Sequence, residues 1–347
     1  MSGSLYTSHP RALTTLYADL ESYALGHREV FVGTAGSVVE RENASGFRFY
    51  AHQFYDGGGK RRERYVAGPA GSDDAERLAG ELRGRIAELK GLVPSLRMLA
   101  REGFAIVDPK AYATLASLHN HGVFGAGGLL VGSHAYGVLL NRLGARAAGY
   151  TTEDVELARA EALAFETLPE KGRLEILRES GIEFVEVPSL DRRKPPTSFK
   201  ARGHSPFHVD LLVPSRDESF PTVRVPELQA FATGLPYLGY LLAESQVAMV
   251  MAREGCCAVR VPVPERYAIH KLIISRLRTG REAKAGKDVL QACVLAAVLG
   301  DSHPGALEAA RSQVPRRARK HLDRALEVAL PLLEAHPRAR EELTGMG

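Results

Sequence analysis

The sequence predicts a mixed α/β protein, of the α+β or α/β class, built around a small mixed sheet flanked by helices. Apolar and polar residues alternate over residues 33–68, which indicates an N-terminal antiparallel sheet. An apolar run at residues 129–131 leads into a helical stretch, and helical periodicity dominates beyond Pro226. We therefore expect three domains: residues 1–100, a central α/β domain at 101–225, and a C-terminal helical domain at 226–347.

Composition places the chain among ordinary water-soluble proteins. Its 347 residues are 45% hydrophobic, which is enough for a large core, and its net charge of +4 does not by itself indicate a nucleic-acid partner. Cys256, Cys257 and Cys293 are too few and wrongly spaced for a zinc site. No apolar run approaches the ~20 residues of a membrane span and no signal peptide is evident, so we expect a cytoplasmic protein with no membrane partner. The oligomeric state stays open.

The N-terminal domain is expected to contain a helix at residues 9–27, three strands and a long helix. The strands are predicted at 37–42, 47–54 and 61–66, and the helix at 72–103, with an interruption at Pro94. The sheet carries basic residues interleaved with aromatic ones, among them Lys60, Arg61, Arg62 and Arg64. Such a face is able to bind RNA through phosphate contacts and base stacking, or it is a structural cap with a solvated basic end.

The central domain begins with a strand at Leu129–Val131, followed by Gly132-Ser133 and a helix through Leu143. Glycine lets backbone N–H groups approach an anion closely, and the N-terminus of a helix is partly positive. Gly132 and Ser133 are therefore candidates for binding phosphate, although an ordinary turn has the same pattern.

Two acids alternate with apolar residues about twenty positions later. Asp154 and Glu156 would lie on one face of a strand, while Val155 and Leu157 enter the core. A further strand at 207–213 carries a single acid, Asp210. Clustered carboxylates suit a hard divalent cation such as Mg²⁺, but alternating acids also occur on solvated sheet faces.

Between these strands we expect a helix near 171–180, a strand at 183–187 and a polar loop at 189–203. The loop contains five basic residues that would reach a triphosphate or an acceptor, or would be solvated: Arg192, Arg193, Lys194, Lys200 and Arg202. Helices are expected after Pro226 at 239–253, 264–278, 286–299, 305–312 and 315–335.

The glycine-serine turn after a strand, the D-x-E pair and the later lone Asp together resemble the DNA polymerase beta-type nucleotidyltransferase superfamily. The branch that the chain resembles is that of stand-alone bacterial nucleotidyltransferases related to abortive-infection toxins. Two departures are visible: the gap from Ser133 to Asp154 is longer than in minimal members, and Glu156 stands where many members have Asp.

The resemblance implies a nucleotidyltransferase fold and a catalytic role for Asp154, Glu156 and Asp210, which would hold Mg²⁺ or Mn²⁺. It further implies that Gly132, Ser133 and Lys271 contact the triphosphate of an NTP, with Lys287 or Asp288 as a supporting partner. The alternative for Lys271, Lys287 and Asp288 is ordinary charge on a helix surface. The expected activity is transfer of a nucleoside monophosphate to RNA, in particular tRNA. The alternatives are a protein or small-molecule hydroxyl as acceptor, or a catalytically silent nucleic-acid-binding module.

Overall fold

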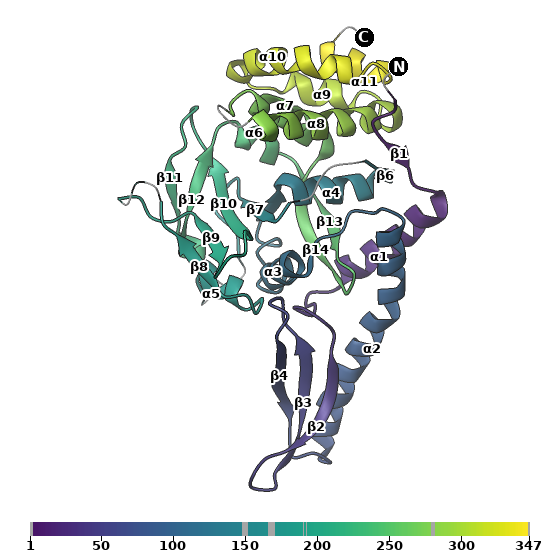
Figure 1. The fold of residues 1–347 in the computed structure, drawn as a ribbon, viewed down its shortest axis with the longest axis vertical. Helices are drawn as coiled ribbons and strands as arrows, with labels where there is room; N and C mark the ends of the chain where they lie inside the picture. Colours follow the sequence, from purple (N-terminus) through teal and green to yellow (C-terminus); the bar gives the residue numbers. More distant parts are fainter. Residues whose placement is uncertain are drawn as a thin grey trace.

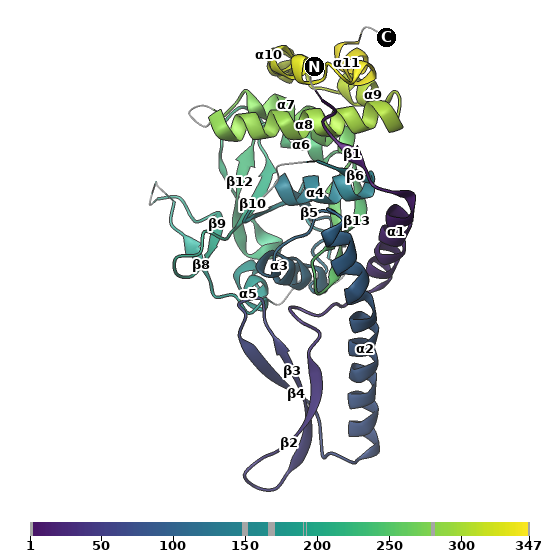
Figure 2. The ribbon, with the colours of Figure 1, turned by 45° about the vertical axis from the view of Figure 1, so that its right-hand side comes forward.

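A computed structural model describes residues 3–147, 152–165, 171–189, 191, 193–278 and 282–345. It has a body built around a mixed sheet, a layer of C-terminal helices on one side of the body, and an arm that projects on the opposite side (Figure 1). The same arrangement is visible after a 45° turn (Figure 2). The expected mixed α/β architecture, with a small antiparallel sheet at the N-terminal side, is confirmed.

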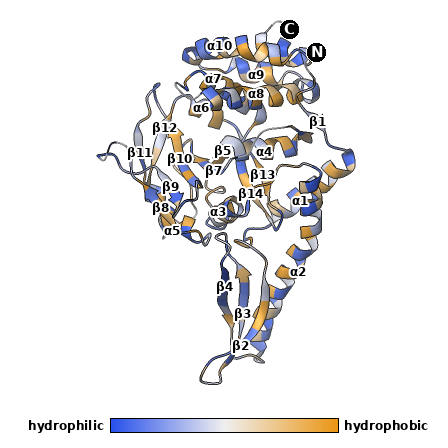
Figure 3. Cartoon of the chain, viewed as in Figure 1, coloured by the Kyte–Doolittle hydropathy of each residue, from blue (hydrophilic) through white to orange (hydrophobic). Residues whose placement is uncertain are grey.

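The arm contains an antiparallel sheet of order β2-β3-β4, with strands at Ser37–Glu42, Arg48–Tyr55 and Arg61–Ala67. One face packs on α2 (Asp73–Arg101), where Tyr50, Ala67, Ala75 and Ala79 form a buried cluster. Residues 61–65 of β4 are all exposed. Figure 3 shows the same strand as hydrophilic along most of its length.

Helix α2 continues through Pro94, so the expected interruption is wrong. It begins at Ser72, whose hydroxyl accepts a hydrogen bond from the Ala75 N–H at 3.3 Å. Beyond the proline, Leu96 and Leu99 are fully buried in a cluster with residues of α1 (Arg11–Gly26). This apolar burial stabilises the last turns and offsets the backbone hydrogen bond that proline removes.

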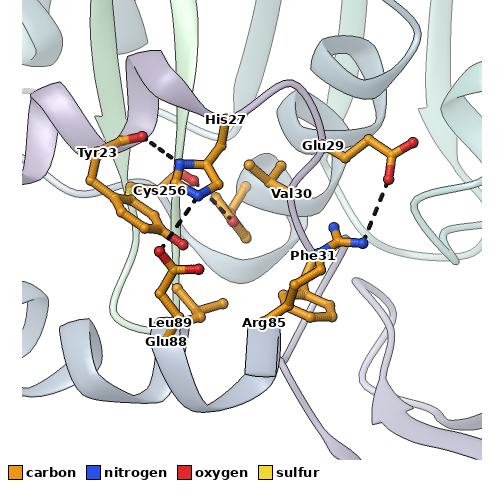
Figure 4. Close-up of a pocket in the computed structure, with 10 residues that line it drawn as sticks. Tyr23, His27, Glu29, Val30, Phe31, Arg85, Glu88, Leu89 and Cys256 are labelled. Atoms are coloured by element: carbon orange, nitrogen blue, oxygen red, sulfur yellow. Dashed lines mark hydrogen bonds and ion pairs between the residues drawn. The ribbon is translucent and has the colours of Figure 1, made fainter. Parts of the chain in front are cut away.

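The arm contacts the body in two places. One contact surrounds a pocket of about 150 Å³ that is lined by α1, α2 and the chain at 29–31. The Arg85 guanidinium there lies 3.7 Å from Glu29 and 5.4 Å from the centre of the Phe31 ring, and these side chains are drawn in Figure 4. At the other contact, the β3–β4 turn meets the body, and the Gly57 N–H donates to the Ser180 carbonyl at 2.8 Å. A Cβ at Gly57 would lie 2.4 Å from that of Ala113, so this turn is closely packed against the body.

The central sheet has the order β11-β12-β10-β7-β5. Its strands are β5 (Leu129–Val131), β7 (Asp154–Ala158), β10 (His208–Pro214), β11 (Thr222–Val225) and β12 (Ala230–Leu235). Strands β7 and β10 are parallel, and β5 is antiparallel to β7. The first half of β10 also pairs with β9 (Ser198–Ala201), which pairs in turn with β8 (Phe184–Val187). Strand β9 lies inside the expected polar loop, because pairing with β10 gives that segment a sheet partner.

Helices cover this sheet and complete the body. They are α3 (Pro109–Asn120), α4 (Gly132–Arg142), α5 (Arg173–Arg178), η1 (Pro226–Leu228) and α6 (Leu238–Leu242). The C-terminal layer contains α7 (Pro264–Ser275), α8 (Glu282–Ser302), α9 (Ala306–Ser312), α10 (Arg316–Leu332) and α11 (Pro337–Thr344). A short β1 (Thr7–Ser8) pairs with β6 (Ala145–Arg146).

The expected helix at 239–253 is wrong. After α6, the chain forms β13 (Ser245–Met251), which pairs along its whole length with β14 (Cys256–Pro262). Met249 and Met251 enter the cluster around α1, while Ala248 and Val250 enter the main core. Because both faces of β13 are buried over residues 248–251, this part is apolar throughout and lacks the alternation that identifies a strand.

No helix within the described ranges has the length and apolar character needed to cross a membrane.

Candidate active site

Gly132 directly follows β5 and begins α4 with a positive φ of +67°. A Cβ at this position would lie 1.6 Å from the Glu156 Oε2 atom, so the Glu156 carboxylate occupies the space that any other side chain would need. The Gly132 carbonyl accepts a hydrogen bond from the Tyr267 hydroxyl at 2.7 Å. Glycine is therefore required here by the backbone conformation and by close approach of a carboxylate.

The two predicted acidic strands lie side by side. In the parallel pairing of β7 and β10, Asp210 is opposite Glu156 and His208 is opposite Asp154. Residues paired in this way share a face of the sheet, so the three predicted carboxylates and His208 lie on one face. Val155 and Val209 are fully buried on the opposite face.

Each carboxylate has a different neighbour. The Ser198 hydroxyl donates a short hydrogen bond to Asp210 Oδ1 across the β9–β10 pairing. The Asp154 Oδ1 atom lies 3.7 Å from His208 Nδ1. Among the described residues, no three His, Cys, Asp or Glu side chains converge in a group that would hold a metal ion as they stand.

Burial raises the pKa of Glu156, and the nearby Asp210 charge adds to this effect, whereas the Lys271 ammonium opposes it. Removing water and placing two carboxylates close together both disfavour the ionised form. A divalent cation would relieve both penalties, and the donor set of hard oxygens fits such an ion. Asp154, Glu156 and Asp210 are the residues that would hold it.

A buried ionic cluster on α7 and α8 lies beside this face. The Lys271 ammonium is 2.7 Å from Asp288 Oδ1 and the Arg278 guanidinium is 2.5 Å from Asp288 Oδ2. Both Lys271 and Asp288 are buried. The same helices reach the glycine turn, since Gln291 Nε2 lies 3.4 Å from the Ser133 hydroxyl. The pKa of Lys287 is lowered by burial and then by the nearby Lys271 charge.

The predicted residues Lys271, Lys287 and Asp288 thus lie in a cluster next to Glu156 and the glycine turn. Arg278, Tyr267 and Gln291 were missed, although all three lie on or directly beside the two helices that had been singled out. Ser198 and His208 were also missed as site residues. Their spacing from Asp210 carries no signal until the pairing of β9, β10 and β7 is known.

Arg173, at the start of α5, was missed too. It is 1% exposed, and its guanidinium carbon lies 4.8 Å from the centre of the Phe199 ring. Burial lowers its pKa to about 9, while the Asp210 charge acts in the opposite direction. Within the part of the chain that the structure describes, its guanidinium nitrogens have no hydrogen-bond partner.

The predicted basic residues divide into two groups. In the polar loop, Lys200 is opposite His208 in the β9–β10 pairing and so lies on the carboxylate face, and Arg202 pairs with Glu183. Arg193 and Lys194 are exposed, and Arg192 lies outside the described residues. On the arm, Lys60, Arg61 and Arg64 are exposed, while Arg62 lies 2.6 Å from the buried Asp56 carboxylate.

A cleft of about 1360 Å³ lies between the base of the arm and the body. From the arm it is lined by Tyr55 and by the turn at residues 56–59. From the body it is lined by residues 106–110, by the β13–β14 turn at 252–254, and by His134. Thr152 and Glu153, just before Asp154, and Phe207, just before His208, also line it, so the cleft lies at the edge of the sheet where β7 and β10 begin.

A nucleotidyltransferase family model matches residues 109–315, which include the glycine turn, the carboxylates and the α7–α8 cluster. No curated protein and no solved structure matches the chain. The matched segment covers more than half of the sequence and every residue placed around the carboxylate face. The chain therefore belongs to the nucleotidyltransferase family and is a transferase enzyme.

Proposed function

We propose that this enzyme is a divalent-metal-dependent nucleotidyltransferase that moves a nucleoside monophosphate from an NTP to a hydroxyl of RNA, with tRNA as the expected acceptor. The observation that carries the proposal is the juxtaposition of three carboxylates, a glycine turn at a helix start and a buried cation cluster. Placement in the cytoplasmic, bacterial branch related to abortive-infection toxins is part of the same proposal and rests on the sequence resemblance.

The NTP would lie with its triphosphate between the start of α4 and the α7–α8 cluster. The N-terminus of this 11-residue helix carries partial positive charge, and Ser133 supplies a hydroxyl. Lys271 and Arg278 bring two cations that share one counter-ion, Asp288, so the cluster is suited to an additional anion. Lys287 adds a third cation on the same helix as Asp288.

Asp154, Glu156 and Asp210 would hold Mg²⁺ or Mn²⁺, which neutralises phosphate charge and makes a bound hydroxyl more acidic. Asp210 is oriented by the Ser198 hydroxyl and accepts the proton of the acceptor hydroxyl. The acceptor oxygen forms a bond to the α-phosphorus, the bond from that phosphorus to the bridging oxygen breaks, and pyrophosphate leaves. The protein contributes by positioning the reactants and stabilising charge.

RNA is preferred as acceptor because of the arm. Tyr55 and Tyr65 are 53% and 57% exposed, and basic residues stand between them on β4. Exposed aromatic rings stack on bases, and neighbouring cations neutralise phosphates. A protein or small-molecule hydroxyl, and a silent nucleic-acid-binding module, remain the alternatives.

The test is to incubate the pure protein with Mg²⁺, total RNA and each α-labelled NTP in turn. We expect a labelled macromolecule that ribonuclease degrades and protease does not. Label that protease removes would show that the acceptor is a protein and not RNA. A lack of label with every NTP and both classes of acceptor would contradict the transfer activity itself.

A further inference from the structure

The cleft between the arm and the body is not lined by Gly132, Ser133 or any α7–α8 residue proposed for the NTP. Its lining comes from the arm, α3, the β13–β14 turn, the residues just before β7 and β10, and His134 of α4. Figures 1 and 2 show α8 and the arm on opposite sides of α4. The two substrates of a transfer reaction would therefore reach the carboxylates from different sides.

The size and walls of the cleft indicate what it binds. Its volume of about 1360 Å³ exceeds the roughly 300–1,000 Å³ that is typical of small-ligand pockets. The walls combine the exposed aromatic ring of Tyr55, aliphatic Ile106 and Val107, and the backbone of three consecutive glycines at 57–59. An exposed ring and bare backbone suit flat, unpaired bases, which stack on aromatic side chains.

Charge at the cleft is compatible with a polyanion at its mouth. Of its acidic lining residues, Asp56 is paired with Arg62 and Glu254 with Arg97, whereas Glu153 is exposed; Lys110 adds a cation to the lining. Asp108 caps α3 by accepting hydrogen bonds from two backbone N–H groups. The turn that lines the cleft continues directly into the exposed Lys60 and Arg61, and the exposed Arg253 lies on the opposite wall. Cations thus stand where phosphates would leave the cleft.

His134 provides an independent observation. It follows the glycine turn, lines the cleft and is 6% exposed, and its Nε2 atom has no hydrogen-bond partner among the described residues. Burial lowers its pKa to about 4, so the ring is neutral near pH 7. A buried polar atom without a partner is costly, and a ligand hydroxyl or base edge would satisfy it.

We propose that this cleft is the acceptor site and that it takes the unpaired terminal nucleotides of an RNA strand, with Tyr55 as the stacking surface and His134 as a hydrogen-bonding contact. The inference rests on the proposed nucleotidyl transfer and adds the place and the form of its acceptor. Only a single-stranded end presents both free base faces and a terminal hydroxyl; an internal or base-paired segment does not.

The kinetic test compares Tyr55→Ala and His134→Gln with the parent enzyme. Tyr55→Ala is expected to raise the KM for a short single-stranded RNA roughly tenfold or more, because a stacking surface is lost. His134→Gln is expected to raise the same KM, and neither variant should change the KM for NTP or the melting temperature by much. Phe220→Ala is the matched control, since Phe220 is 56% exposed and does not line the cleft. An unchanged KM for RNA in both cleft variants would overturn the proposal.

A binding test detects RNA in the cleft whether or not the enzyme transfers nucleotides. A short RNA ending in 4-thiouridine is irradiated with the protein, and the attached peptide is identified by mass spectrometry. Attachment at residues 55–59 or 252–254 is expected. Attachment confined to other surfaces, or no attachment at all, would contradict an RNA site in the cleft. If transfer is absent but attachment occurs in the cleft, the proposed function fails while the RNA site stands. If a protein is labelled in place of RNA, the acceptor class is wrong.

Discussion

Gly132→Ala is the substitution that most directly probes the geometry of the site. The new Cβ would lie 1.6 Å from Glu156 Oε2 and 2.7 Å from its carboxyl carbon, and the backbone would keep a φ of +67°. The backbone conformation alone costs about 1–2 kcal/mol for a residue with a side chain. Displacing the half-buried Glu156 adds a penalty of the kind seen on overpacking, about 1–3 kcal/mol.

The chain offers a control for the backbone part of this cost. Gly122 has a φ of +70°, and a Cβ added there would have no atom within 4 Å, so Gly122→Ala suffers the strain without the clash. We expect urea unfolding to show a larger loss of stability for Gly132→Ala than for Gly122→Ala. Adding Glu156→Ala to Gly132→Ala should restore stability to the level of Gly122→Ala without restoring NTP transfer.

The result that would refute this reasoning is equal destabilisation by Gly132→Ala and Gly122→Ala, with no rescue by Glu156→Ala. Glu156 would then not occupy the space above the glycine. Normal NTP binding by Gly132→Ala in a titration would, in addition, place the triphosphate away from this turn.

Three other perturbations test single side chains or small groups of them. Ser198→Ala should lower kcat about tenfold and leave the melting temperature nearly unchanged, because Asp210 loses one charge-assisted hydrogen bond; unchanged kcat would remove Ser198 from the site. Burial lowers the pKa of His270 to about 3, so the unfolded chain binds a proton below pH 6.5 that the native state does not, and stability should fall as the pH falls through this window. His270→Gln should flatten this part of the pH–stability profile, and an identical profile would contradict the buried neutral ring. The third perturbation replaces the exposed arm cations Lys60, Arg61 and Arg64 by serine. The slope of log K for RNA binding against log salt concentration should become shallower by about 0.7 per lost phosphate contact, and NTP binding should not change. An unchanged slope would indicate that the arm is a structural cap.

The sequence predicted the elements whose pattern is local. Strand β2 was predicted with its observed bounds, because alternation and flanking turns define it. The common face of Asp154 and Glu156 follows from a period of two residues, and pairing of β7 with β10 places Asp210 beside them. The division of the chain into three domains and the roles of the site residues remain predictions.

What the sequence could not predict depends on pairing between distant segments. Strand β13 lacks a strand pattern because residues 248–251 are buried on both faces, and β9 lacks one because its strand character comes from pairing with β10. The Ser198 contact follows from that same pairing. The cleft exists because the β3–β4 turn is packed against residues 113 and 180 of the body, a contact that no local pattern encodes.

The central claim is nucleotidyl transfer at the three carboxylates, and the most direct measurement compares α- and γ-labelled NTP. With RNA and Mg²⁺, the parent enzyme should attach the α-label to RNA and release the γ-label as pyrophosphate. Asp154→Asn, Glu156→Gln and Asp210→Asn should each abolish attachment and leave the melting temperature unchanged or raised, because each substitution relieves repulsion between like charges. Attachment of the γ-label, or retained attachment of the α-label by any two of the three variants, would contradict the account.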